Sequence, residues 1–321
     1  MLLGIEIGGT KLQLGVGPGD GTPLVTLERL DVEPKHGAER IRQQLQQVAK
    51  ALIERHGITA VGVGFGGPVD AAAGRTIVSH QVDGWKDFPL ADWCRQTLGL
   101  PTVVANDSDL AGLAEARFGA GQGHRVVFYT NVGSGIGGAL VVDGQLYRGG
   151  AGVASELGHL RPGPQADHPK QNVESIASGF AIAASARQRL LRPRQTDEEA
   201  AADLLRRCDG QLEKVTAALV AQAAVEGNLL AWEVFDGACQ TFGWAVAQMI
   251  TLLAPNVVVI GGGVSLVGEE LLFAPLREYV SRYVFPPLLG TFEIVPARLG
   301  EEVVVHGALA IASEQWSVVS G

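Results

Sequence analysis

Short apolar runs joined by glycine-rich turns open both halves of this 321-residue chain. Leu2 to Ile7 leads into Gly8-Gly9-Thr10-Lys11, and Val126 to Tyr129 leads into Asn131-Val132-Gly133-Ser134-Gly135; a second apolar run, 12–17 or 136–142, leaves each turn. Each pattern predicts a β-hairpin. Because glycine has no Cβ, such turns let backbone N–H groups approach an anion, as in phosphate-binding loops. One such turn is more typical of a plain strand connection, but two favour a duplicated architecture with a phosphate chain between its halves.

Further strands and amphipathic helices alternate along the chain. Apolar residues recur at helical spacing between Gly37 and Gly57, Thr196 and Glu199 have the spacing of a capping box, and Asn228 can cap a long helix. This alternation predicts an α/β protein with two lobes facing a cleft, hinged at the glycines of 119–123. The predicted strands are 22–31, 60–65, 101–105, 257–260 and 292–295, and the other predicted helices are 90–98, 110–118, 178–190, 196–207, 212–224, 228–253, 271–283 and 304–313.

Polar residues and glycines follow two of the predicted strands directly. Asn106-Asp107-Ser108-Asp109 comes after one strand, where open α/β sheets place their ligands. Helix capping explains one such residue but not four in a row, so we expect Asn106 or Asp107 to take part in chemistry. Gly261-Gly262-Gly263 follows another strand, and it favours either a close approach to a ligand or a strand-to-helix turn.

Composition narrows the class of protein. Hydrophobic residues make up 46% of the chain and charged residues 18%, so we expect it to be folded throughout. The net charge of −9 argues against nucleic acid or an anionic membrane as a partner, and the basic run 187–194 is typical of a solvated helix end. Three scattered cysteines and the absence of a basic leader before the first apolar run predict a cytoplasmic protein.

Five segments together resemble one known family, the ROK family of sugar kinases and sugar-responsive repressors. They are GIEIGGTK (4–11), GFGGPVD (64–70), VANDSDLAGLAEARFGAG (104–121), NVGSGIGGALVVDGQLYRGGAGVASELGH (131–159) and VVIGGGVS (258–265). The resemblance implies a two-lobed ribonuclease H-like fold, shared with actin and hexokinase, and glucokinase-like, ATP-dependent phosphorylation of a hexose with Mg²⁺. It also implies an N-terminal lobe at 1–120, completed by a final helix at about 302–321, and a C-terminal lobe at 121–301.

The resemblance also implies roles for individual residues. Asp107 corresponds to the catalytic base that accepts the proton of a sugar hydroxyl. Several polar groups around one pocket suit a polyol, because each unmatched hydroxyl costs about 1–3 kcal/mol. The implied sugar-binding residues are Gly67, Gln81, Asn106, Asp107, Glu156, His159 and Glu174. The implied nucleotide-binding residues are Glu6, Gly8, Gly9, Thr10, Lys11, Gly133, Ser134, Gly135, Gly262 and Gly263.

Three features depart from the family pattern. Glu6 stands where members usually have aspartate, although a longer carboxylate can still order a Mg²⁺-bound water. The family's zinc-binding cysteines are replaced by Asn172, Asp167 and Gln165, so we expect no structural zinc, and His159, which zinc ordinarily fixes, needs other support. Gln81 replaces the more usual asparagine, which leaves the preferred hexose open.

Two other functions fit the same fold. One is a catalytically weak or inactive sugar-binding regulator; the other is an actin-like filament protein, which would not require Asp107, Glu156 and Glu174 together. Repressors of the family carry an N-terminal DNA-binding extension; because this chain is acidic and its sequence opens on the first predicted strand, we expect no direct binding to DNA. The long apolar helix at 229–253 and the family resemblance predict a homodimer.

Overall fold

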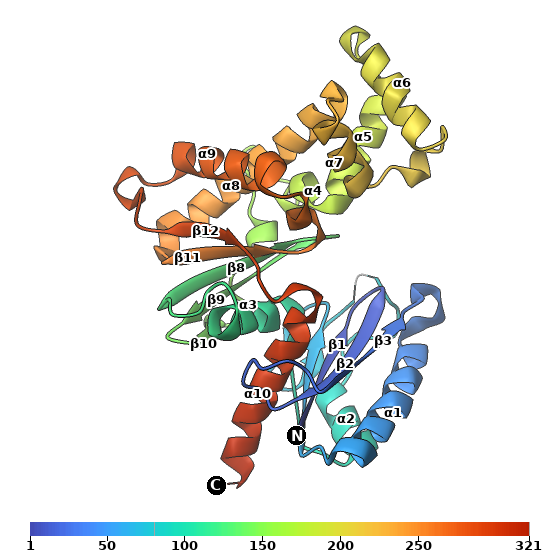
Figure 1. Ribbon diagram of the computed structural model, residues 1–321, viewed down its shortest axis with the longest axis vertical. Coiled ribbons are helices and arrows are strands. Elements are labelled where there is room, and N and C mark those ends of the chain that lie inside the picture. The colour runs from blue at the N-terminus through green and yellow to red at the C-terminus, as the bar shows by residue number, and fades with distance from the viewer. Residues whose placement is uncertain (80, 321) are drawn as a thin grey trace. The chain divides into compact units, whose positions relative to one another are not determined.

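The computed structural model describes residues 1–79 and 81–320, which form two compact units. Unit 1 comprises Met1–His124, Ala139–Ala154 and 298–320, and unit 2 comprises Arg125–Gly138 and Ser155–Ala297 (Figure 1). The predicted lobe boundary at residue 120 stays a prediction, and the units differ from it in that 139–154 group with unit 1.

The first sheet is built around a buried central strand, β1. Every residue of β1 is buried, it pairs antiparallel with β2 and parallel with β4, and the strand order is β3-β2-β1-β4-β7. Two short strands, β5 (Val69–Asp70) and β6 (Arg75–Thr76), pair separately. The sheet strands are β1 (Leu2–Ile7), β2 (Lys11–Gly17), β3 (Thr26–Asp31), β4 (Ala60–Phe65) and β7 (Thr102–Asn106).

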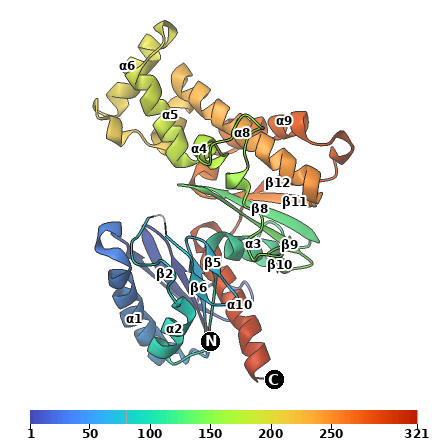
Figure 2. The same ribbon diagram turned by 180° about the vertical axis from the view of Figure 1, so that it is seen from behind.

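Helices cover both faces of the first sheet. On one face lie α1 and α2, as Figure 2 shows. The apolar stripe of α1 packs into the same core as α2 and the strands. On the other face α10 lies close to the strands, because Gly4 and Gly62 have no side chain; a Cβ on Gly62 would be 1.9 Å from the Ala308 carbonyl oxygen. The helices are α1 (Gly37–His56), α2 (Leu90–Leu98), α3 (Asp107–Phe118) and α10 (Val303–Ser320).

The second sheet repeats the order of the first. Its order is β10-β9-β8-β11-β12, with β8 in the place of β1 and with β11 parallel to both β8 and β12. The duplication that the two glycine turns predict is therefore confirmed. The strands are β8 (Val126–Val132), β9 (Ile136–Val142), β10 (Gln145–Tyr147), β11 (Val257–Gly261) and β12 (Glu293–Pro296).

The helices of unit 2 share one apolar core with β8 and β11. The predicted helix start at 178 and the predicted cap Asn228 are confirmed: Ser178 accepts a hydrogen bond from Ala181 N, and Asn228 accepts one from Ala231 N. The helices are α4 (Glu174–Ala177), α5 (Gly179–Leu191), α6 (Glu198–Arg207), α7 (Ala217–Val225), α8 (Leu229–Leu253) and α9 (Ala274–Tyr283).

One predicted helix and one predicted cap in this unit are wrong. The segment 212–224 is not one helix, because Thr216 caps a new helix by accepting from Leu219 N, after a single turn at Leu212–Lys214. Thr196 is not a cap either: Asp197 accepts from Arg194 N, and α6 begins at Glu198. In both places the α-helix begins later than predicted, at Glu198 and at Ala217.

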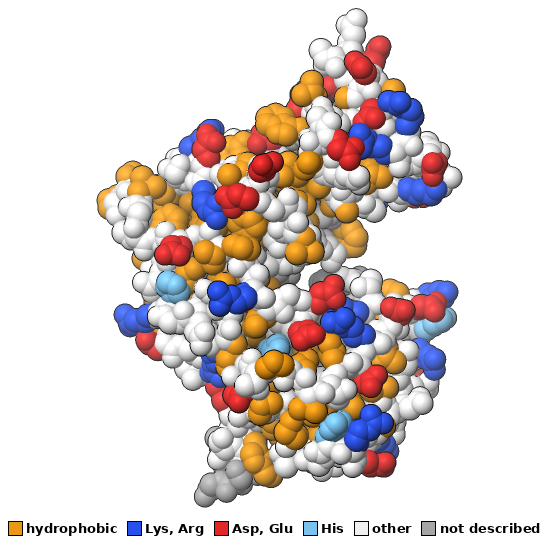
Figure 3. Space-filling model, in the orientation of Figure 1, with side chains coloured by type: hydrophobic (Ala, Val, Ile, Leu, Met, Phe, Trp, Pro, Cys, Tyr) orange, Lys and Arg blue, Asp and Glu red, His pale blue; other side chains and the backbone are white. Residues whose placement is uncertain are grey.

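The surface shows mixed charge. On the face in Figure 3, Lys and Arg side chains lie among Asp and Glu side chains. Within residues 1–79 and 81–320, no helix combines the length and apolar character that a membrane span requires.

Candidate functional site

The junction of β7 and α3 brings Gly67, Asn106 and Asp107 together. Asn106 is the N-cap of α3, and its Oδ1 accepts from Ser108 N at 2.9 Å and from Asp109 N at 3.2 Å. Its Nδ2 donates to the Gly67 carbonyl and to Asp107 Oδ1, each at 3.0 Å. Capping therefore explains Asn106, and the same side chain also orients the carboxylate beside it.

Asp107 is the first residue of α3, and only one of its oxygens receives these bonds. Oδ1 accepts from Ser108 N at 2.8 Å. Oδ2 faces the turn after β4, 3.4 Å from the position that a Cβ on Gly66 would take. Burial, with a smaller contribution from the nearby Glu6 charge, raises the pKa of Asp107 to about 6, although the hydrogen bond from Ser108 N opposes this rise. A carboxylate with this pKa is ionised near neutral pH and still accepts a proton readily.

Glu6 supplies a second buried carboxylate in unit 1. Its side chain meets Lys11 Nζ at 3.2 Å and Gln13 Nε2 at 2.8 Å. Burial raises the pKa of Glu6, and Lys11 counteracts that rise. The sequence analysis missed Gln13, which is opposite Glu6 in the β1–β2 register; a polar residue inside an apolar strand was the available signal.

The turn between β1 and β2 carries the first glycine loop. It is closed by a bond from Gly8 N to the Lys11 carbonyl at 2.9 Å. The Gln81 side chain packs directly against Gly9, since a Cβ there would be 1.5 Å from Gln81 Oε1. The structure thus places Gln81 against the predicted phosphate turn formed by Gly8, Gly9, Thr10 and Lys11.

Unit 2 holds the second glycine loop between β8 and β9. Gly262 fits beside it only as glycine, because its φ is +86° and a Cβ would be 2.5 Å from the Val132 carbonyl oxygen. A Cβ on Gly133 or on Gly263 would instead meet no atom within 4 Å. The protein itself therefore leaves space at these two positions.

Glu174 lies against the same loop. Its Oε2 accepts a hydrogen bond from Ile136 N at 2.8 Å, and a Cβ on Gly135 would be 2.5 Å from that oxygen. Glu174, Gly135 and the adjoining Ser134 are thus brought together. This contact was not part of the predicted sugar-binding role of Glu174.

Glu156 and His159 are exposed on the segment that precedes the aperiodic loop. The partner of His159 is Asn172, which stands where the family pattern has a zinc-binding cysteine. Asn172 Nδ2 lies 3.4 Å from His159 Nδ1. Asn172 Oδ1 accepts from Ser175 N at 2.9 Å, which turns its NH₂ group toward the ring. In this arrangement Nδ1 is the acceptor and Nε2 carries the ring proton.

The described residues contain no group of three or more His, Cys, Asp or Glu side chains placed to hold a metal. Cys94, Cys208 and Cys239 are free and buried, and burial raises the pKa of Cys94 to about 12.

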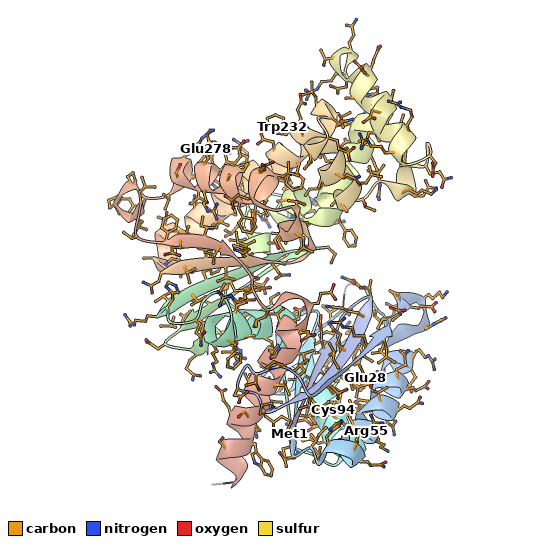
Figure 4. The ribbon with its side chains drawn as sticks, viewed as in Figure 1. Met1, Glu28, Arg55, Cys94, Trp232 and Glu278 are labelled. Atoms are coloured by element: carbon orange, nitrogen blue, oxygen red, sulfur yellow. The ribbon has the colours of Figure 1, made fainter. Side chains whose placement is uncertain are left out.

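A cavity of about 210 Å³ lies elsewhere in unit 2 and involves none of the predicted site residues. Trp232 on α8 and Glu278 on α9, both labelled in Figure 4, contribute to its wall together with Asp236, Glu270 and Tyr279.

The chain is similar in sequence to a known protein family and to a named relative. The model of the ROK family matches residues 2–315. A glucokinase of Thermotoga maritima is 32% identical over 318 residues, with 98% of each chain covered.

Two solved structures resemble the fold closely. A ROK family glucokinase from Streptomyces griseus, solved in complex with glucose and AMPPNP, has a TM-score of 0.83 and 32% identity, covering 98% of this chain and 99% of that one. A ROK hexokinase from Thermus thermophilus has a TM-score of 0.80 and 29% identity, covering 100% and 99%. The predicted fold class, α/β of the ribonuclease H-like type that actin and hexokinase share, is confirmed.

Proposed function

The chain belongs to the ROK family, and on this premise we propose that it is a glucokinase-like enzyme that transfers a phosphoryl group from ATP to a hydroxyl of a hexose. The observation that carries the proposal is the β7–α3 junction. There Asp107 is held through one oxygen, presents the other, and has a pKa raised to about 6. The glucokinase names of the relatives support a sugar kinase as the broader class.

Asp107 acts as the general base. Its Oδ2 accepts the proton of the attacking sugar hydroxyl as that oxygen bonds to the transferred phosphorus. Oδ1 cannot readily swing away, because Ser108 N and Asn106 Nδ2 both donate to it. Holding one oxygen therefore fixes the direction of the other, which is the positioning that phosphoryl transfer requires.

ATP and Mg²⁺ suit the residues present. Gly133 and Gly263 leave space that no protein atom fills, and backbone groups at such turns bind phosphate oxygens. Glu6 would face the metal through a bound water, and Lys11 would face the phosphates. When bound, Mg²⁺ would neutralise charge on the phosphate oxygens. A buried carboxylate with a raised pKa, as in Glu6, is stabilised by an added cation.

The sugar is held by Gly67, Gln81, Asn106, Glu156, His159 and Glu174 in this proposal. Asn172 takes over the orienting role that zinc has in other members, because it leaves the ring proton on Nε2, from which His159 can donate to a hydroxyl. We therefore expect elemental analysis of the purified protein to find less than one zinc per chain, and a stoichiometric zinc would contradict this role for Asn172.

A coupled assay of ADP release tests the function directly. Free glucose, fructose, mannose and N-acetylated hexosamines are each supplied with Mg-ATP, and we expect saturable turnover with at least one of them. Sugar binding in calorimetry without turnover of any sugar would instead favour the regulatory alternative.

We further propose a homodimer that works in the cytoplasm without nucleic acid. Leu229, Trp232 and Leu252 of α8 are 71%, 49% and 76% exposed, which supports burial against a second copy. The free thiols support a reducing compartment, and the net charge of −9 opposes nucleic-acid binding. Light scattering on the eluting protein should give twice the chain mass, and a monomer would contradict the dimer.

A further inference from the structure

Glu115 is a fully buried carboxylate in the middle of α3, at 0% exposure. Three backbone N–H groups converge on it. Oε2 accepts from Ala120 N at 2.8 Å, and Oε1 accepts from Arg298 N at 2.9 Å and from Leu299 N at 2.8 Å. Hydrogen bonds to an ionised acceptor are among the stronger ones in proteins, and a buried carboxylate depends on them.

The three donors lie beside two of the four points where the chain passes between units. The chain first leaves unit 1 after His124, and it returns for the last time at Arg298. One side chain of unit 1 thus binds both connections, although they are more than 170 residues apart in sequence.

The bonds also show which parts of these connections are held. Gly119 N and Gly121 N donate to the Glu115 carbonyl at 3.1 and 2.9 Å, so 119–121 is fixed to α3 by the backbone as well as the side chain of Glu115. The next glycine, Gly123, has a φ of +87°. Beyond it, Val126 N donates to Asn256 Oδ1 at 2.9 Å, within unit 2.

Where the chain returns to unit 1, two successive residues, Ala297 and Arg298, are hydrogen-bonded to different units. Ala297 N donates to the Ile260 carbonyl of β11 at 2.9 Å, whereas Arg298 N donates to Glu115. Residue 297 is therefore held by unit 2, and residue 298 is held by α3 of unit 1.

We infer that Glu115 is a positioning residue that fixes the hinge between the units. It clamps two of the four connections between the units to α3, so that on these two connections backbone rotation is confined to 122–125 and to the Ala297–Arg298 link. The first three residues of the predicted hinge at 119–123 then move with α3. Because Asp107 is the first residue of the same helix, the clamp ties the hinge to the proposed catalytic base. This catalytic consequence rests on the proposed function, whereas the clamp itself does not.

The test uses Glu115→Gln in the full chain, with Asp197→Asn as a matched control. Like Glu115, Asp197 is buried and accepts a hydrogen bond from a backbone N–H group, that of Arg194. Its other donor is the side chain of Arg189, and it lies in the helical part of unit 2. Hydrogen exchange is measured by mass spectrometry with and without glucose and Mg-AMPPNP.

In the wild type we expect the amides of Ala120, Arg298 and Leu299 to stay protected in both states, with ligand-dependent changes in 122–125. In Glu115→Gln the amide oxygen can still accept from Arg298 N and Leu299 N, but the NH₂ group cannot accept from Ala120 N, so the Ala120 amide should exchange at least about tenfold faster and the other two should exchange moderately faster. In Asp197→Asn all three should match the wild type. Equal exchange in Glu115→Gln and the wild type would overturn the clamp. Rapid exchange of Ala120 in the ligand-free wild type would also overturn it.

A second variant keeps the charge of Glu115. A Cβ on Gly119 would be 2.0 Å from Glu115 Oε2, so Gly119→Ala must displace the carboxylate and should reproduce the faster exchange.

Kinetics then separate positioning from binding. In both variants we expect kcat for sugar phosphorylation to fall about tenfold, with less than about threefold change in the KM for ATP. An unchanged kcat beside faster exchange would show that the clamp has no catalytic role. If the wild type transfers no phosphate at all, the exchange pattern still decides whether the clamp exists.

Discussion

The two sheets share one strand order but differ in charge at equivalent positions. On β1, Glu6 is paired in register with Gly64 of β4; on β8, Asn131 is paired with Gly261 of β11. The same place in the two sheets therefore carries a carboxylate in one and a neutral amide in the other.

The outer parallel strands differ in the same way. β7 ends at Asn106 and is followed by Asp107, whereas β12 ends at Pro296 and is followed by Ala297. The two sheets thus share a strand order but carry different chemical groups at equivalent strand ends. The first sheet gathers buried carboxylates with raised pKa values, which suit proton transfer and cations. The second presents glycines with open space beside them, which suit neutral backbone contacts to phosphate.

The largest expected effect comes from removing the charge at the end of β7. Asp107→Asn keeps an acceptor for Ser108 N but cannot take a proton, so we expect kcat to fall about 10³-fold while sugar affinity changes less than about threefold. Steady-state kinetics and calorimetry measure the two. The control is Asp109→Asn, two residues along α3, whose carboxylate pairs with Arg148 at 3.1 Å; it should stay within about threefold of the wild type. An active Asp107→Asn enzyme would remove Asp107 from the role of base.

Glu6→Gln should have the next largest effect. It removes the charge that holds Lys11 and that would face the metal, so we expect kcat to fall about 10- to 100-fold. Glu302→Gln is the control, because Glu302 also pairs with a basic side chain of the first sheet, Arg29, but is 38% exposed. If both variants lose activity equally, the buried carboxylate has no special part in the reaction.

Substitutions in and beside the glycine loop of the second sheet should weaken ATP binding rather than slow the chemical step. Gly133→Ala and Gly263→Ala meet no protein atom, so the fold should accept them, while the ATP site should not. We expect the KM for ATP to rise about tenfold with little change in melting temperature. Gly237→Ala, equally unhindered but on α8, should leave the KM for ATP unchanged. Unchanged KM values in all three variants would show that phosphate does not approach this loop.

The smallest effect is expected in the loop 160–172, where Asn172 lies beside His159. Asn172→Ala frees the His159 ring, and we expect the KM for the sugar to rise about threefold to tenfold at a nearly constant KM for ATP. Gln171→Ala, at the exposed neighbouring position, serves as the control. A rise in both KM values to the same extent would point to general loosening of the loop.

The sequence predicted what depends on neighbours along the chain. The apolar runs around Gly8-Gly9 and Gly133 to Gly135 marked both hairpins, and Asn228 marked the start of α8. Local signals failed at Thr196 and near Thr216, where two possible helix starts lie within a few residues and only packing decides between them.

Contacts between distant segments could not be predicted from one sequence. Glu115 binds Arg298 across 183 residues, and Asn172 reaches His159 across a loop without periodicity. The position of Gln81 over Gly9 likewise depends on how two loops meet after folding. The residue types of the candidate site were therefore predictable, but the bonds that orient them were not.

The pH dependence of kcat/KM for the sugar tests most directly whether acid–base chemistry resides at the end of β7. With the pKa of Asp107 near 6, the carboxylate is ionised above that pH and protonated below it. Activity should therefore fall about tenfold for each unit of pH below 6. Because the Glu6 charge raises the pKa of Asp107, Glu6→Gln should move this acid limb to lower pH. A flat profile through pH 6, or a limb that Glu6→Gln leaves in place, would contradict the account.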